Sequence, residues 1–235
     1  MTETPKLRLA YVQPSQAQKH VTVNEGFNRI DAVTQLTLSS QEVETPPVSP
    51  EDGEAYAVPD TASSPWSEQS GRVAIWQNQG WVYLTPQVGW RAWIIDEGKL
   101  KVWTGEDWGQ PPAARTTSGA TSLFDVIEVT HSVGTGGASS TVPVIPANSV
   151  GIGVTGRVRN DITGSLSSWQ LGVPGSPTRY GTGLGASAGS FAMGLTGSPQ
   201  TYYAETALEL TAEGGSLSGG DVTLAVHYMK ITPPE

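Results

Sequence analysis

The run DVTLAVHYMKI at residues 221–231 alternates apolar and polar side chains along its length. In an extended chain successive side chains point to opposite faces, so Val222, Leu224, Val226 and Tyr228 share one face. This period is typical of a half-buried β-strand. Charged residues form only 15% of the chain, and its 28 glycines and 17 prolines favour short strands joined by many turns. The sequence therefore predicts a mainly β fold.

One segment departs from this pattern and predicts a helix over residues 23–38. Thr22 and Glu25 fit a capping box, in which each side chain satisfies an exposed backbone N–H at the other's position. Apolar residues then recur at spacings of three and four, which gives one stripe of an amphipathic helix: Val23, Phe27, Ile30, Val33 and Leu36.

The run GQPPAARTTSGATS at residues 109–122 separates two parts of different composition. We expect an N-terminal domain at 1–110, a linker at 111–122 and a C-terminal domain at 123–235. The first would combine the helix with a small Trp-rich β-hairpin domain that serves assembly or anchoring. The second would be an antiparallel, jelly-roll-like β-sandwich that presents a receptor-binding or glycan-binding surface.

Tryptophans mark the N-terminal part, since seven of the eight lie between Trp66 and Trp108. Two pairs have the same spacing, Trp76 with Trp81 and Trp103 with Trp108, each around a short polar turn with glycine. Across a hairpin the members of a pair would face each other and close a small core. The alternative is that these rings stack on sugar faces. We favour packing for both pairs.

Five residues of the C-terminal part are candidate glycan contacts, because they combine an aromatic face or a guanidinium with a polar tip. Each has a packing or subunit-interface role as its alternative. They are Trp169, Arg179, Tyr180, Tyr202 and Tyr203.

Charge and composition exclude several other partners. The formal net charge is −9 with only 13 Lys and Arg, which argues against nucleic acid or an anionic membrane. No stretch approaches 18 consecutive apolar residues and the N-terminus lacks a signal-like apolar region, so we expect no membrane insertion. The chain has no cysteine and its three histidines are isolated, so we expect neither a bound metal nor a cofactor.

The run GASAG at residues 185–189 matches the G-x-S-x-G motif of hydrolases, with Asp221 and His227 following in the order of a catalytic triad. That motif needs a strand–turn–helix unit in an alternating α/β fold, and no such alternation is present. We therefore assign no catalytic residue and expect no enzymatic activity.

Two long runs carry a family resemblance. Residues 9–36 (LAYVQPSQAQKHVTVNEGFNRIDAVTQL) and 89–108 (GWRAWIIDEGKLKVWTGEDW) resemble a domain-of-unknown-function family encoded in alphaproteobacterial prophages and gene transfer agents. Residues 145–158 (IPANSVGIGVTGRV) and 201–215 (TYYAETALELTAEGG) are similar to a second module found with that family.

The resemblance implies a structural virion protein, a tail fibre or head spike, that attaches to host cell-surface polysaccharide. Such a protein would be made in the bacterial cytoplasm, released by lysis and displayed on the particle surface. Its partners would be other virion proteins, the host polysaccharide and further copies of itself, with a trimer as the first expectation. The alternatives are a capsule-degrading depolymerase and a purely architectural connector that binds no glycan.

Overall fold

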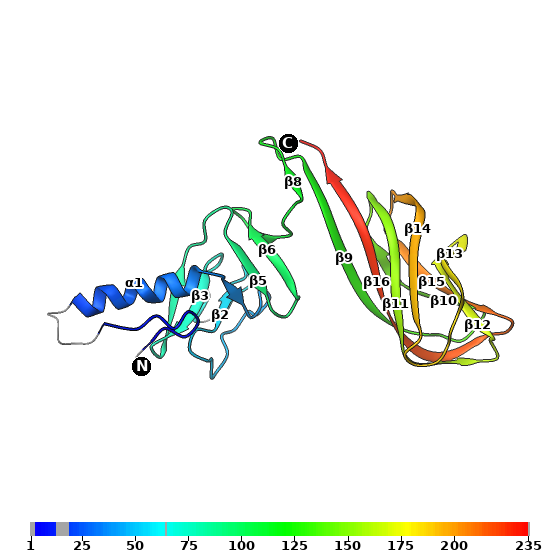
Figure 1. The fold of residues 1–235 in the computed structure, drawn as a ribbon, viewed down its shortest axis with the longest axis horizontal. Helices are drawn as coiled ribbons and strands as arrows, with labels where there is room; N and C mark the ends of the chain where they lie inside the picture. The colour runs from blue at the N-terminus through cyan, green and yellow to red at the C-terminus, as the bar shows by residue number, and fades with distance from the viewer. Residues whose placement is uncertain (1–2, 13–18, 64, 235) are drawn as a thin grey trace. The chain divides into compact units, whose positions relative to one another are not determined.

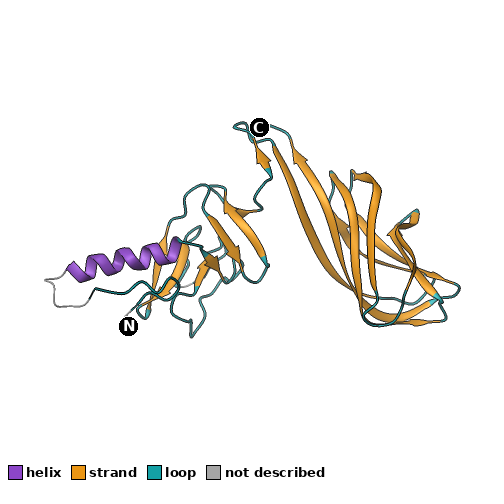
Figure 2. Cartoon of the chain, viewed as in Figure 1, coloured by secondary structure: helices purple, strands orange, loops and turns teal. Residues whose placement is uncertain are grey.

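A computed structural model describes residues 3–12, 19–63 and 65–234. The chain divides into two compact units, Met1–Pro111 and Pro112–Glu235, each with its own buried core (Figures 1 and 2). Strands dominate both units, and one helix lies near the N-terminus of the described chain. The predicted fold class, mainly β with an N-terminal helix, is confirmed.

The N-terminal unit contains helix α1 and two small sheets, one in the order β1-β5-β6-β7 and the other in the order β2-β3-β4. Strand β1 pairs in parallel with β5, and the remaining pairs are antiparallel. Both sheets supply residues to a common core. The elements are α1 (Lys19–Val33), β1 (Thr37–Leu38), β2 (Ala55–Ala57), β3 (Val73–Gln77), β4 (Gly80–Leu84), β5 (Arg91–Ile94), β6 (Lys99–Trp103) and β7 (Trp108–Gly109).

Helix α1 begins and ends earlier than predicted. It runs from Lys19 to Val33 instead of 23–38, so Thr22 lies inside the helix and the predicted capping box with Glu25 is wrong. The apolar stripe also has an unexpected environment. Val23, Ile30 and Val33 are exposed to solvent, and among the five residues of the stripe only Leu36, beyond the helix end, is buried.

Polar residues of α1 bind the N-terminal segment 3–12, which folds back on itself through a bridge between Glu3 and Ala10. The buried Asp31 accepts a hydrogen bond from the Thr4 hydroxyl at 2.7 Å and another from the Lys6 backbone N–H at 3.1 Å. Asn24 bonds both the N–H and the carbonyl of Val12, at 2.8 and 3.1 Å. Backbone groups shielded from water need such partners. The contact of α1 with the hydrophobic core comes from Ala32, which is buried.

The C-terminal unit is an antiparallel β-sandwich. One sheet has the order β10-β15-β12-β13 and the other the order β14-β11-β16-β9-β8, with a single hydrophobic core (Figure 1). The predicted core face of the last strand is confirmed, since Val222, Leu224, Val226 and Tyr228 are all buried. The strands are β8 (Ala114–Arg115), β9 (Thr121–Ser132), β10 (Ala138–Ile145), β11 (Ser149–Gly164), β12 (Ser168–Val173), β13 (Ser176–Leu184), β14 (Phe191–Tyr202), β15 (Thr206–Glu213) and β16 (Leu217–Thr232).

The segment 111–122, expected to be a linker, contains strand β8, which pairs with the first residues of β9. In the glycine-rich stretch 180–194, residues 185–190 form the loop between β13 and β14. Close packing requires glycine at position 194 of β14, because a Cβ there would lie 2.1 Å from the Tyr180 carbonyl oxygen.

Within the described ranges, no helix has the length and apolarity needed to cross a bilayer.

Candidate functional site

The tryptophan pairs of the N-terminal unit face each other across hairpins, as their spacing predicts. Trp76 is the register partner of Trp81, and Trp103 is that of Trp108. Their ring centroids are 5.2 and 5.6 Å apart, with edge-on and tilted geometry respectively. Trp103 and Trp108 are buried, and the other two rings are half-buried. Such pairs stabilise a hairpin beyond the area they bury.

Trp81 has further aromatic neighbours that favour packing over ligand contact. Its ring lies 5.0 Å from that of the fully buried Trp66 and 6.1 Å from that of Tyr56. The hairpin that carries it turns through Asn78 and Gln79, both with positive φ. This two-residue turn sets the register that brings the rings together.

The five candidate glycan residues of the C-terminal unit do not converge on one surface. Trp169, Tyr180 and Tyr202 belong to the sandwich core, so their rings offer no face on which a sugar could stack. Trp169 is 1% exposed, and the Tyr180 and Tyr202 hydroxyls share a hydrogen bond of 2.7 Å. Burial raises the pKa of Tyr180. Tyr203 is 81% exposed, and Arg179 is half-buried with no hydrogen-bond partner for its Nε atom in the described structure.

The G-x-S-x-G motif lies in a strand–loop–strand context, between β13 and β14. Its would-be partners are engaged elsewhere. His227 forms a hydrogen bond of 3.0 Å with the Thr155 hydroxyl, and Asp221 accepts bonds from Ser132 and Asn160 at 2.7 Å each. His227 and Asp221 are therefore held by separate local contacts and do not form the base–orienter pair of a triad.

One carboxylate, that of Glu213, collects four hydrogen bonds and links three strands. It accepts from Ser168 at 2.5 Å, Gln170 at 2.9 Å, Thr182 at 2.8 Å and the Gly183 N–H at 2.8 Å. The Ser168 bond is the largest of the effects that lower the pKa of Glu213 to about 2. A carboxylate held ionised with its acceptor positions filled stabilises structure and is poorly suited to proton transfer.

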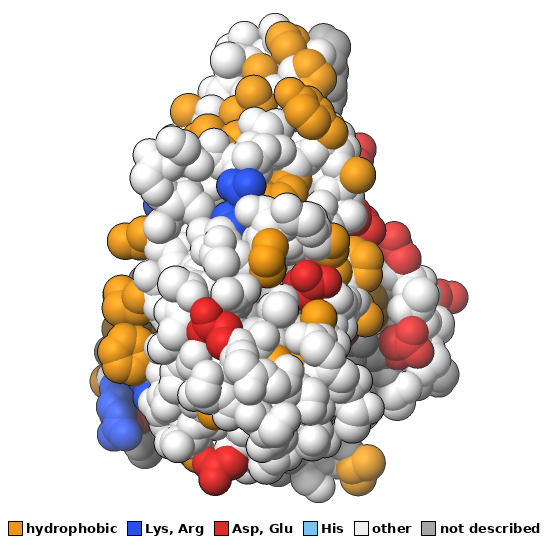
Figure 3. Space-filling model, turned by 90° about the vertical axis from the view of Figure 1, so that its right-hand side faces the viewer, with side chains coloured by type: hydrophobic (Ala, Val, Ile, Leu, Met, Phe, Trp, Pro, Cys, Tyr) orange, Lys and Arg blue, Asp and Glu red, His pale blue; other side chains and the backbone are white. Residues whose placement is uncertain are grey.

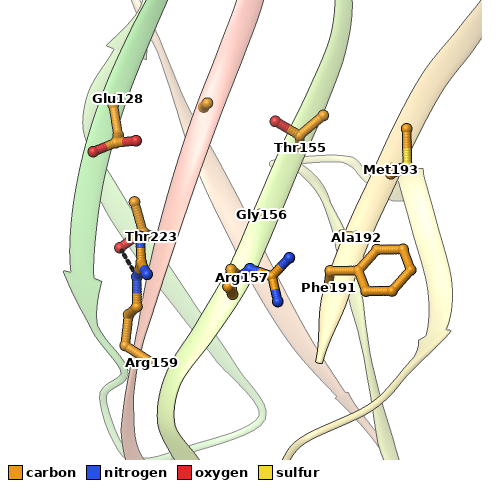
Figure 4. Close-up of a pocket in the computed structure, with 10 residues that line it drawn as sticks. Glu128, Thr155, Gly156, Arg157, Arg159, Phe191, Ala192, Met193 and Thr223 are labelled. Atoms are coloured by element: carbon orange, nitrogen blue, oxygen red, sulfur yellow. Dashed lines mark hydrogen bonds between the residues drawn. The ribbon is translucent and has the colours of Figure 1, made fainter. Parts of the chain in front are cut away.

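A hollow of about 400 Å³ lies on the outer face of the five-stranded sheet (Figure 4). Strands β14, β11, β16 and β9 all contribute to its lining. The side chains of Thr223, Ala225 and Thr155 are short, whereas β11 also contributes two long arginines. Two rows cross the strands β14, β11, β16 and β9 in register: Met193, Thr155, Ala225 and Glu128, then Phe191, Arg157, Thr223 and Thr130.

Two arginines of β11 give the hollow a local positive charge in an otherwise acidic protein. Arg157 lies with its guanidinium carbon 5.9 Å from the centre of the Phe191 ring and donates to the Gly189 carbonyl at 3.0 Å (Figure 4). Arg159 donates from Nε to the Thr223 hydroxyl at 2.9 Å. Within the described part of the chain neither guanidinium forms an ion pair, so each keeps donors for an external acceptor.

Large apolar side chains lie on the same outer face as this hollow, on strands β14 and β9. On β14 the outward residues Phe191, Met193 and Leu195 are 60%, 68% and 74% exposed, and we call them the β14 margin. On β9 the exposed Phe124 and Val126 form, with Glu128, the β9 margin. A space-filling view shows hydrophobic side chains along the left edge of the visible face, with basic side chains just below (Figure 3). An apolar surface of this kind marks a contact site.

Sequence reasoning missed this face, although β9 carries a signal. Its apolar residues occur on both sides of the strand, with Ile127 and Val129 against the core and Phe124 and Val126 outside. A strand that is apolar on both faces is covered on both faces in most folds. The arginines gave no comparable signal, because single charges on a strand are ordinary.

No group of three or more His, Asp or Glu side chains in the described ranges is arranged to hold a metal ion. The hollow itself offers guanidiniums, hydroxyls, one carboxylate and apolar surface. These groups can bind an anionic or amphipathic partner. Among the hydroxyls, that of Thr155 hydrogen-bonds to His227 at 3.0 Å.

Comparison with known proteins gives a partial family match. A family described as "Protein of unknown function (DUF2793)" matches residues 23–109, which is less than half of the chain. No curated protein matches. Among solved structures, a chain of the "Cyanophage Pam1 capsid asymmetric unit" aligns with 55% of this chain and 96% of that chain. Its sequence identity is 20% and the TM-score is 0.31, which is too low to support an argument about function.

Proposed function

We propose that this protein is a structural, non-catalytic component of a phage-like particle, a tail fibre or head spike, that makes contacts through the outer face of its five-stranded sheet. One observation carries the proposal: β14, at the edge of that sheet, leaves Phe191, Met193 and Leu195 mostly exposed. Edge strands usually carry charges or prolines that prevent pairing with other chains, and β14 has one proline, Pro199, and no charged residue. Three apolar side chains in a row favour a surface that is covered in an assembly.

The resemblance of residues 9–36 and 89–108 to a prophage and gene-transfer-agent family supports the particle setting. In that setting the chain is made in the bacterial cytoplasm, released by lysis and displayed on the particle. Its partners there are other particle proteins and further copies of itself.

Three sets of contacts support a non-catalytic role. The Glu213 carboxylate is saturated with donors, and its pKa of about 2 keeps it ionised at neutral pH. His227 and Asp221 are each engaged by neighbours on their own sheet. The hollow contains one carboxylate, Glu128, whereas glycoside hydrolysis generally needs a pair at a defined separation.

The particle setting is tested by purifying particles from a producing strain on a density gradient and probing fractions with an antibody to this chain. We expect the chain to co-sediment with the major particle proteins and to remain attached after a high-salt wash. A chain found only in the soluble fractions would contradict the proposal.

Attachment to host polysaccharide is the second candidate function, and the hollow favours it. Arg157 and Phe191 offer a cation and a partly free ring side by side, which suits an acidic sugar. Purified protein would be incubated with host capsule. Retention that is lost in the Arg157→Gln variant, with no oligosaccharide released, would support attachment. Released oligosaccharide would overturn the non-catalytic role and restore the depolymerase alternative.

A further inference from the structure

We infer that the outer face of the five-stranded sheet is an interface between copies of this chain, in which the β14 margin of one copy packs against the β9 margin of the next. This inference rests on the proposed structural function and names the partner of the same face. It follows from two properties of the margins, one apolar and one electrostatic.

The apolar property is that both margins carry exposed side chains of similar size. The β14 margin has Phe191, Met193 and Leu195, and the β9 margin has Phe124, which is 60% exposed, and Val126. Between them lies the hollow described above. Two ridges separated by a hollow cannot bury each other within one copy. A second copy can bury them by placing its ridge beside or between them.

The electrostatic property is that the two sides of the face carry opposite charges. Arg157 and Arg159 lie on β11, next to β14, whereas Glu128 lies on β9. Strand β16 separates them, and neither arginine is ion-paired in the described structure. When the β14 margin meets the β9 margin of another copy, the arginines of one approach the glutamate of the other. The face is therefore complementary to itself in charge as well as in apolar surface.

This self-complementarity favours a second copy over other occupants. An anionic polymer would meet Glu128 and five apolar side chains in addition to the two arginines. In a closed ring, as in a symmetric pair, each copy uses its β14 margin once and its β9 margin once. The inference thus requires an oligomer, and the measured mass gives the number of copies in it.

The first experiment measures the mass of the full chain by size-exclusion chromatography with light scattering, over a concentration series. We expect an oligomer for the wild type and for the control Val142→Asp, whose residue is 70% exposed on the other sheet. Met193→Asp should weaken association about thirtyfold or more, because it would bury an unpaired carboxylate. Its circular dichroism should match that of the wild type, since Met193 is 68% exposed.

The second experiment is a charge exchange between the two margins. Arg157→Glu alone and Glu128→Arg alone should each raise the dissociation constant about tenfold or more, because like charges then meet at the interface. The double variant restores opposite charges, so its dissociation constant should return to within about threefold of the wild-type value. Restoration by the double variant cannot arise from loss of folding in the single variants.

Three results would overturn the inference: a monomeric wild type, an oligomer unaffected by Met193→Asp, or a double exchange as weak as the single variants. A monomer that binds acidic polysaccharide through Arg157 would assign the face to a glycan instead. A monomer that still co-sediments with particles would leave the proposed function standing without this interface. An oligomer that is absent from particles would support this interface and contradict the proposed function.

Discussion

Replacing Trp169 by alanine tests whether this ring is part of the core or a sugar-binding platform. It is the one tryptophan after residue 108, it is 1% exposed, and its Nε1 donates to the Gly185 carbonyl at 2.9 Å. A Trp→Ala change in a core costs about 3–5 kcal/mol. Loss of the hydrogen bond adds about 1 kcal/mol. We therefore expect the C-terminal unit to lose about 4–6 kcal/mol of unfolding free energy.

Urea denaturation followed by far-UV circular dichroism measures this loss. With a denaturant slope of about 2 kcal/mol/M, the midpoint of the C-terminal transition should fall by about 2–3 M. Tyr203→Ala is the matched control, because its side chain is 81% exposed and such changes usually stay within about 0.5 kcal/mol. An unchanged midpoint for Trp169→Ala, together with loss of polysaccharide retention, would refute the core assignment.

Three further changes have defined outcomes. Gln79→Gly should stabilise the N-terminal unit by about 0.5–1 kcal/mol and so raise its melting temperature, because Gln79 and Asn78 both have positive φ in the turn. A lower melting temperature would contradict this. Gly151→Ala should lower the unfolding free energy of the C-terminal unit by about 1–3 kcal/mol, because the added Cβ would lie 2.9 Å from the Tyr202 ring. Urea denaturation measures this loss, and an unchanged midpoint would count against the packing described. The stabilisation by Glu213, whose pKa is lowered to about 2, is fully present above its ordinary value of 4.5 and is lost as the pH falls towards 2. Glu213→Gln should flatten the pH dependence of unfolding in that window. An identical profile would show that folding does not lower the pKa of this carboxylate.

Local patterns predicted the elements whose partners are close in sequence. The cross-strand pairs of tryptophans follow from the short turns between them, and the buried face of β16 follows from its alternation at Val222, Leu224 and Val226. Helix α1 was predicted as an element but with the wrong packed face. Its apolar stripe implied a core contact through Val23, Ile30 and Val33, which are exposed. The contacts are instead made by Ala32 with the core and by Asp31 and Asn24 with the segment that precedes the helix.

The candidate site was not predictable because its residues meet only through the strand order. Arg157, Phe191 and Glu128 come from β11, β14 and β9, and their approach depends on pairings between strands far apart in the chain. Residue type alone also misled the search for glycan contacts. A tyrosine or tryptophan with a polar tip fits a buried hydrogen bond as well as a sugar, and Tyr180 and Trp169 make such buried bonds.

The pairing of the first and last long strands of the sandwich determines how this unit responds to tension. Thr121 is the register partner of Thr232, and the Thr121 N–H donates to the Thr232 hydroxyl at 3.1 Å. The polypeptide therefore enters and leaves the sandwich at the same end. A force applied across these two points would open β9 from β16 one hydrogen bond at a time, which resists less than sliding the strands past each other. The same adjacency makes the sandwich suitable for grafting into a loop of another protein, because its entry and exit points are already side by side.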